Sequence, residues 1–184
     1  MQRERGAANM NFLLVSDMQN DFVTGPLGTP EAQSIVPAIA KTIHNFPGEV
    51  GFAVDLHLAK TYASLQEGKK FPVLHCHSYP GSKIITELKP MALAVYPKSA
   101  PGCQLYAEHI WKRYYETNGN LTITLAGVRT DISIISTALL LRTSFPDVAI
   151  TVDASCCAGT TPENHKKALD IMKQCYIDVT INGQ

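Results

Sequence analysis

Six short runs of apolar and β-branched residues alternate with longer amphipathic segments along the chain. The runs span residues 12–17, 49–57, 93–98, 121–127, 148–154 and 177–181. Helical spacing of apolar positions, as in Ile35, Ile39 and Ile43, predicts helices over 34–46, 103–119, 132–144 and 161–175. Because strands that are separated by helices form βαβ units, the pattern predicts an α/β fold. We expect a doubly wound, mostly parallel sheet of about six strands with helices on both faces.

Proline and glycine positions mark where several of these helices begin and end. Pro37 is best placed in the first turn of the first helix, which puts the start of that helix near Ser34. Pro162 marks the start of the last helix, and Asn118–Gly119 is a C-terminal cap signal. The segment 56–94 has no long periodic pattern, and irregular stretches of that length in compact domains are commonly functional.

Chemically reactive side chains gather where the predicted strands end. Asp17, Asp55, Lys98 and Asp153 each stand at the end of a strand. Ser133 follows the fourth strand, at its corner with a helix. A single aspartate in such a place is more often a cap or turn residue. Ligands of these sheets bind beyond the carboxyl ends of the strands, however, so reactive groups at several strand ends indicate a site.

The carboxylate, lysine and hydroxyl at this edge suit nucleophilic catalysis. A carboxylate takes the proton of the nucleophile, and the charge of a lysine favours the deprotonated form. Backbone N–H groups at the start of the next helix hold the oxyanion. A serine hydroxyl is much harder to ionise than a thiol. Ser133 is therefore either a nucleophile or an ordinary residue of a helix start.

A second group of residues has the chemistry of metal ligands. Asp55 and His57 form an Asp-x-His at the end of the second strand, and Glu67 and His75 follow in the irregular segment. Carboxylate and imidazole together suit zinc, iron or manganese. We therefore expect a divalent metal here, zinc first among the three, and we do not assign the neighbouring Cys76 as a ligand.

Length, charge and cysteine content narrow the class of protein. The 184 residues suit a single domain over 11–184, behind a polar, flexible lead-in over 1–10 that has no secretory signal. Lys+Arg and Asp+Glu balance at 16 each, which favours neither nucleic acid nor a membrane surface as a partner. Five cysteines without a CxxC spacing indicate free thiols in a reducing, cytoplasmic setting.

Three stretches resemble the isochorismatase-like cysteine hydrolases, a superfamily that includes nicotinamidases. LLVSDMQNDFVTG is similar to the opening motif of the family, and GVRTDIS to its nucleophile motif, G-[VI]-x-T-D-x-C. DAS followed by PENHKKAL fits the last strand and helix. The similarity runs from about Phe12 to Val179. Within the superfamily, VDLH and EGKKFPVLHCHSYPGS most resemble the metal-binding segments of nicotinamidase.

The resemblance implies a role for each matching residue. Asp17 would be the general base and Lys98 its partner, beside position 133. Val128–Arg129 would be a cis peptide, with the amides of Arg129 and Ser133 as the oxyanion hole. The remaining implied roles concern the metal and the substrate ring. The metal, which holds the ring nitrogen, would be bound by Asp55, His57, His75 and Glu67, and Phe22 and Phe71 would pack around the ring.

The implied activity is hydrolysis of a small amide: nicotinamide to nicotinate and ammonia, a reaction of NAD salvage. A homo-oligomer is also expected from the resemblance. Two positions depart from the pattern. Thr61 stands where many nicotinamidases have a second histidine, and Ser133, native or introduced, stands where the family has its cysteine. The chain is therefore an impaired nicotinamidase-like hydrolase, an isochorismatase-type enzyme or other amidase of the superfamily, or an inactive binding protein.

Overall fold

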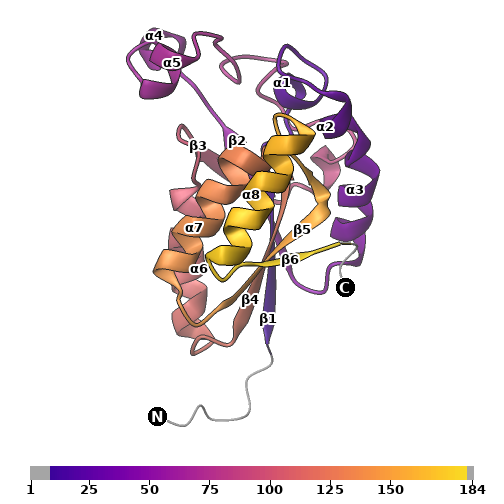
Figure 1. Cartoon of the computed structure of the whole chain (residues 1–184), viewed down its shortest axis with the longest axis vertical. Helices are drawn as coiled ribbons and strands as arrows, with labels where there is room; N and C mark the ends of the chain where they lie inside the picture. Colours follow the sequence, from indigo (N-terminus) through magenta and orange to yellow (C-terminus); the bar gives the residue numbers. More distant parts are fainter. Residues whose placement is uncertain (1–8, 182–184) are drawn as a thin grey trace.

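A six-stranded sheet, all parallel, forms the centre of the molecule (Figure 1). The structure is a computed structural model and describes residues 9–181. The strand order is β3-β2-β1-β4-β5-β6. The strands are β1 (Met10–Ser16), β2 (Glu49–Asp55), β3 (Ala94–Lys98), β4 (Leu121–Val128), β5 (Ala149–Ala158) and β6 (Asp178–Thr180). The doubly wound α/β fold predicted from the alternating pattern is confirmed.

Helices cover both faces of this sheet. One face carries α6 (Gln104–Glu116), α7 (Ile135–Ser144) and α8 (Pro162–Gln174), and the other carries α2 (Pro30–Ser34) and α3 (Val36–Asn45) (Figure 1). Successive residues of β1 show why both faces need cover: Phe12 and Leu14 pack into one apolar cluster, and Leu13 and Val15 into the other. Side chains of a strand alternate between faces, so an uninterrupted apolar run predicts a strand buried on both.

The irregular segment between β2 and β3 holds only short helices. These are α4 (Ala59–Tyr62), α5 (Gln66–Lys70) and the 3₁₀ helix η1 (Lys89–Met91). Helices α4 and α5 stand out beyond the carboxyl ends of the strands, as does α1 (Asn20–Val23) (Figure 1). These segments therefore overhang the sheet edge at which the sequence places its reactive residues.

The strand order reverses between β1 and β4, which lie side by side although β2 and β3 come between them in sequence. A crevice opens at such a switch point. The two strands approach each other closely there, because Gly127 has φ +114° and a Cβ on it would lie 2.1 Å from the carbonyl oxygen of Ser16. Asp17 follows β1 and Ser133 follows β4, so both stand beside the crevice.

Three details differ from the sequence predictions. The helix expected from Ser34 begins at Val36 as α3, with Pro37 in its first turn as predicted, and the separate short helix α2 before it was not predicted. Residues 1–8 of the expected lead-in lie outside the described residues, and Met10 already belongs to β1. The fifth strand continues to Ala158, beyond its predicted end at Ala154, so Asp153 lies inside the strand.

None of the helices in residues 9–181 is long and apolar enough to cross a membrane. All five cysteines are described and all are free, four of them buried.

Candidate active site

Asp17 is held at the carboxyl end of β1 in an unusual backbone conformation. Its φ is +56°, in the left-handed region that asparagine and aspartate tolerate better than most residues. Its N–H donates to the carbonyl of Ala53 at 2.9 Å, and its own carbonyl accepts from the N–H of Gln19 at 2.8 Å. The side chain is buried, with 1% of the residue exposed. The turn therefore fixes a carboxylate inside the protein.

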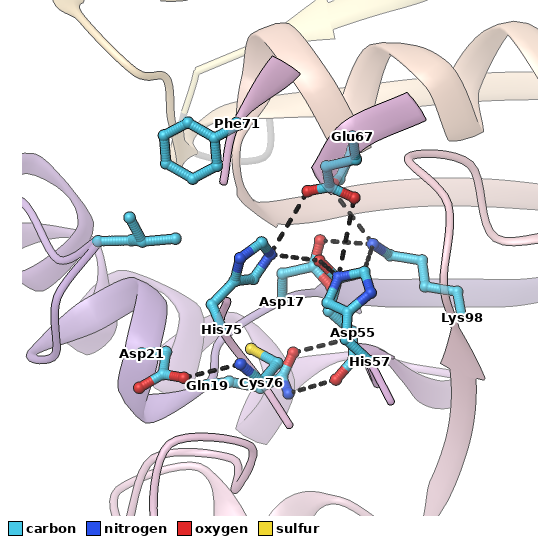
Figure 2. A network of polar contacts seen from close by, with 12 residues as sticks. Asp17, Gln19, Asp21, Asp55, His57, Glu67, Phe71, His75, Cys76 and Lys98 are labelled. Atoms are coloured by element: carbon cyan, nitrogen blue, oxygen red, sulfur yellow. Dashed lines mark hydrogen bonds and ion pairs between the residues drawn. The ribbon is translucent and has the colours of Figure 1, made fainter. Parts of the chain in front are cut away.

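Lys98 lies between two buried carboxylates. Its Nζ is 3.0 Å from Oδ2 of Asp17 and makes a short ion-paired hydrogen bond to Oδ1 of Asp55 (Figure 2). Strand pairing explains the meeting: Asp55 and Lys98 are register partners at the ends of β2 and β3. The same Nζ lies 3.5 Å from Oγ of Ser133. The lysine thus joins the ends of four strands, since Asp17 follows β1 and Ser133 follows β4.

The surroundings shift the pKa of each of these groups. Burial and the charge of Asp55 raise the pKa of Asp17 to about 6, although Lys98 and the Ser133 hydroxyl oppose the shift. Burial raises the pKa of Asp55, but the neighbouring imidazoles of His57 and His75 and the charge of Lys98 outweigh it and hold that pKa well below its usual range. Burial lowers the pKa of Lys98, and the two carboxylates reverse this and keep the ammonium charged.

Ser133 is buried, and it lies in a π-helical turn, η2 (Thr130–Ile134), that leads directly into α7. The N–H of Ile134 donates to the carbonyl of Arg129 at 3.1 Å, the i to i+5 bond of a π turn. Such turns are rare and occur often at functional sites. The Val128–Arg129 peptide just before the turn is cis.

Two side chains of the turn fasten it to the start of α8. Asp131 accepts hydrogen bonds from the N–H of Thr160, at 2.8 Å, and from its hydroxyl. The hydroxyl of Thr130 lies 2.8 Å from Nδ1 of His165. This clamp was not predicted from the sequence. The Thr-Asp pair of GVRTDIS was its only local signal.

Four side chains gather in a second cluster next to Asp17 and Lys98 (Figure 2). Oδ2 of Asp55 lies 3.8 Å from Nε2 of His57 and 3.8 Å from Nε2 of His75. The carboxylate of Glu67, on α5, lies 3.7 Å from Nε2 of His57 and 3.4 Å from Nε2 of His75. The structure therefore brings together the four residues that the sequence suggested as metal ligands.

This cluster fits a divalent metal. One ligand atom from each of Asp55, His57 and His75 lies within 4.8 Å of the others, and all three residues are buried. Both ring nitrogens of His57 are buried and have no hydrogen-bond partner among the described residues. Nδ1 of His75 lies 2.8 Å from the carbonyl of Val73, which leaves Nε2 for the metal. A buried imidazole without a partner is costly, and coordination to a metal removes that cost.

Gln19 and Tyr62 support the cluster, and sequence reasoning missed both. The Gln19 amide accepts from the N–H of Asp55 at 2.7 Å and donates to its carbonyl at 2.9 Å, which fixes the end of β2. The ring of Tyr62 lies 4.9 Å from that of His57, and its hydroxyl donates to the carbonyl of Phe71. Gln19 stands two residues after Asp17, but no local pattern reveals its partner 36 residues away.

A cavity of about 560 Å³ opens over both groups. Asp17, Ser133, Asp55, Glu67 and His75 line it, together with the apolar or cationic side chains of Phe22, Leu27, Lys70, Phe71, Pro101, Arg129 and Ile132. The Phe22 ring lies 5.2 Å from that of His75, and Phe71 is 39% exposed at 6.2 Å from it. Both phenylalanines expected around a substrate ring are thus in the cavity wall.

Asp153 does not belong to this edge, and the sequence prediction for it was wrong. A register shift between β4 and β5 pairs Leu125 with Val152 but Gly127 with Cys157, so β5 bulges and continues past the aspartate. Oδ1 of Asp153 accepts hydrogen bonds from the N–H and the hydroxyl of Ser155. It lines a different cavity, beside α3.

Known structures share this fold over nearly their whole length. A pyrazinamidase of Pyrococcus horikoshii in complex with zinc superposes with a TM-score of 0.77 at 24% identity, covering 93% of this chain and 98% of that one. An N-carbamoylsarcosine amidase from Thermoplasma acidophilum gives 0.76 at 25% identity, covering 95% and 98%. PnC1 from L. infantum, in complex with nicotinate, gives 0.79 at 15% identity, covering 95% and 94%.

None of the curated proteins matches the chain in sequence. The isochorismatase domain matches residues 11–182, which cover all six strands except Met10, the first residue of β1. The chain therefore belongs to the isochorismatase family.

Proposed function

We propose that the chain is a metal-dependent amide hydrolase of the nicotinamidase type, which splits nicotinamide or a small amide of similar shape into a carboxylate and ammonia. One observation carries the proposal: Ser133 Oγ lies 3.5 Å from the Lys98 ammonium, which contacts Asp17, and Ser133 lines the same cavity as Asp55, Glu67 and His75 of the metal-ligand cluster. The amidases among the similar structures support the same class of reaction.

The proposed chemistry assigns the base to Asp17 and the nucleophile to Ser133. Asp17 accepts the hydroxyl proton as Oγ forms a bond to the amide carbon. The amides of Arg129 and Ser133 stabilise the oxyanion. As the C–N bond breaks, Asp17 returns the proton to the nitrogen, and ammonia leaves. Water then attacks the ester carbon while Asp17 accepts its proton, and Asp17 gives that proton to Oγ as the ester bond breaks, which frees the Ser133 hydroxyl and the carboxylic acid.

We assign the metal to Asp55, His57, His75 and Glu67, and we propose zinc because the donor set is nitrogen and carboxylate oxygen. When bound, it supplies a positive charge and a binding point for a ring nitrogen of the substrate. The four ligands would fix the position of the metal and thereby of the ring nitrogen, and Phe22 and Phe71 would pack against the ring. The position of the ring then decides which carbon meets Ser133.

The serine limits the rate. A carboxylate with a pKa of about 6 is a weak base toward a hydroxyl, whereas a thiol beside an ammonium ionises near neutral pH. We therefore propose that the chain binds its amide and turns it over slowly.

The free thiols further support a reducing compartment such as the cytoplasm.

Ammonia release from nicotinamide tests this proposal, with the zinc-loaded chain and its Ser133→Cys variant. We expect slow release by the chain and a much faster release by the variant. An isochorismatase-type enzyme would instead cleave a vinyl ether without metal, and an inactive binding protein would bind nicotinamide but release no ammonia in either form. A folded, metal-loaded Ser133→Cys variant that releases no ammonia contradicts the proposal.

A further inference from the structure

Arg129 brings a positive charge into the wall of the cavity. It is the residue between the fourth strand and the π turn, and its carbonyl accepts bonds from Ile132 and Ile134. Its guanidinium lies 5.5 Å from the centroid of the Phe22 ring and donates one hydrogen bond, from Nη2 to the carbonyl of Leu27 at 3.0 Å. A guanidinium has five N–H donors, and within residues 9–181 only one of them has a hydrogen-bond partner.

No carboxylate in the described part of the chain forms an ion pair with this guanidinium. The three carboxylates that line the cavity are already engaged: Asp17 with Lys98, Asp55 with Lys98 and the histidines, and Glu67 with the histidines. Lys70, at the exposed mouth, is the other cation of the wall without an ion pair among residues 9–181. Lys98 and a bound divalent metal would together carry three positive charges against these three carboxylates, which leaves the charges of Arg129 and Lys70 without a counter-charge in the cavity wall.

The partial burial of Arg129 strengthens the attraction between its charge and an anion. Burial lowers the pKa of Arg129, against the pull of Asp131 and Asp17, but an arginine stays protonated in proteins. A half-buried cation that is paired only with a ring face and one carbonyl gains from any anion that reaches it. Its planar fork matches a carboxylate in particular, through two parallel hydrogen bonds.

We propose that Arg129 makes the site selective for small amides that also carry a carboxylate, remote from the amide that is cleaved. The inference rests on the proposed function and narrows its substrate class. Nicotinamide, which is neutral, would then fill the ring position but leave the guanidinium without a counter-charge. The side chain of Arg129 would determine specificity. This role is separate from that of its backbone amide, which is proposed to bind the oxyanion.

Two ligands of the same shape isolate the effect of the charge. They are 5-carbamoylpyridine-3-carboxylate and pyridine-3,5-dicarboxamide. The first has a carboxylate where the second has a carboxamide, and in both compounds this group is not adjacent to the ring nitrogen. Calorimetry with the zinc-loaded chain, whose Ser133 limits turnover, measures both dissociation constants. We expect the carboxylate to bind roughly 10-fold tighter or better, the range of a charge-assisted bidentate pair.

Three variants assign the preference to the side chain. Arg129→Gln should bring the two dissociation constants within about 3-fold of each other, and Arg129→Lys should retain part of the difference because it keeps the charge without the fork. Lys70→Gln is the matched control: it removes a positive charge from the exposed mouth and should leave most of the preference intact.

Equal binding of the two ligands by the parent chain overturns the inference. A carboxylate preference that survives in Arg129→Gln also overturns it, because the preference would then come from the metal. Binding of neither ligand overturns it too. The proposed function is judged separately, by ammonia release from the same compounds in Ser133→Cys. If that variant hydrolyses both at the same kcat/KM, the amidase stands and the carboxylate selectivity falls; if it hydrolyses neither, the amidase falls.

Discussion

The ammonium of Lys98 lies 3.0 Å from the carboxylate of Asp17, and both side chains are almost completely buried, at 3% and 2% exposed. The same ammonium contacts Asp55, a member of the metal-ligand cluster. One cation therefore sits between the proposed base and the proposed metal site. Removing it would leave two carboxylates facing each other without solvent to screen them.

The first prediction concerns pH. The base works in its ionised form, and the pKa of Asp17 is raised to about 6, so kcat/KM of Ser133→Cys should fall about tenfold per unit as the pH drops below 6. Protonation of Asp17 does not destabilise the fold, so the fall in kcat/KM would not be caused by unfolding. A carboxyl whose folded pKa is raised contributes stability at low pH and loses it as the pH rises through 6. A rate that stays constant from pH 7 to 4.5, with the fold and the metal retained, contradicts the assignment.

The second prediction concerns the buried ion pairs. Lys98→Met should lower the free energy of unfolding by about 3–5 kcal/mol, because it leaves buried carboxylates without a partner. The matched control is Lys167→Met, which removes an exposed pair with Glu163 and should cost less than about 1 kcal/mol. Urea denaturation of both variants measures the difference. Similar costs for the two would mean that Lys98 is not paired as described.

The third prediction concerns the metal. His57→Ala removes a buried residue that we propose as a metal ligand, so the rise in Tm that zinc gives the parent chain should disappear in this variant. His44→Ala, on the exposed surface of α3, should keep the full rise. Thermal melts with zinc and with a chelator make the comparison. An undiminished zinc response in His57→Ala would place the metal elsewhere.

The fourth prediction concerns the clamp between the π turn and α8. Asp131→Ala removes two hydrogen bonds to Thr160 and should cost about 1.5–3 kcal/mol of stability, because the acceptor is charged. In the Ser133→Cys background it should also lower kcat more than it raises KM, since it loosens the nucleophile's position. Asp170→Ala, on the exposed side of α8, should change stability by less than about 0.5 kcal/mol.

Much of this architecture could be predicted from local patterns. Alternation of strands and helices gives the sheet, and a parallel sheet brings the residues that end its strands to one edge. Asp17, Asp55 and Lys98 therefore could be placed together without any knowledge of contacts. Ser133 stood out because the segment before it reads as a strand and the segment after it as a helix.

The rest depends on pairings that no local window contains. The bulge in β5 exists because of how β4 pairs with it, so Asp153 was wrongly placed at the active edge. Gln19 meets Asp55 across 36 residues, and Thr130 meets His165 across 35. The unpaired charge of Arg129 also appears only when the partners of every neighbouring carboxylate are known.

The central claim is that Ser133 occupies the position of the nucleophile in an otherwise intact amidase site. The most direct measurement is kcat/KM for ammonia release from nicotinamide, and from its 5-carboxylate, by the zinc-loaded parent and by Ser133→Cys. A thiol beside Lys98 should ionise readily, so we predict a gain of at least about 100-fold for one of the two amides. A variant that is folded and zinc-loaded, yet no faster than the parent on either amide, would contradict the account.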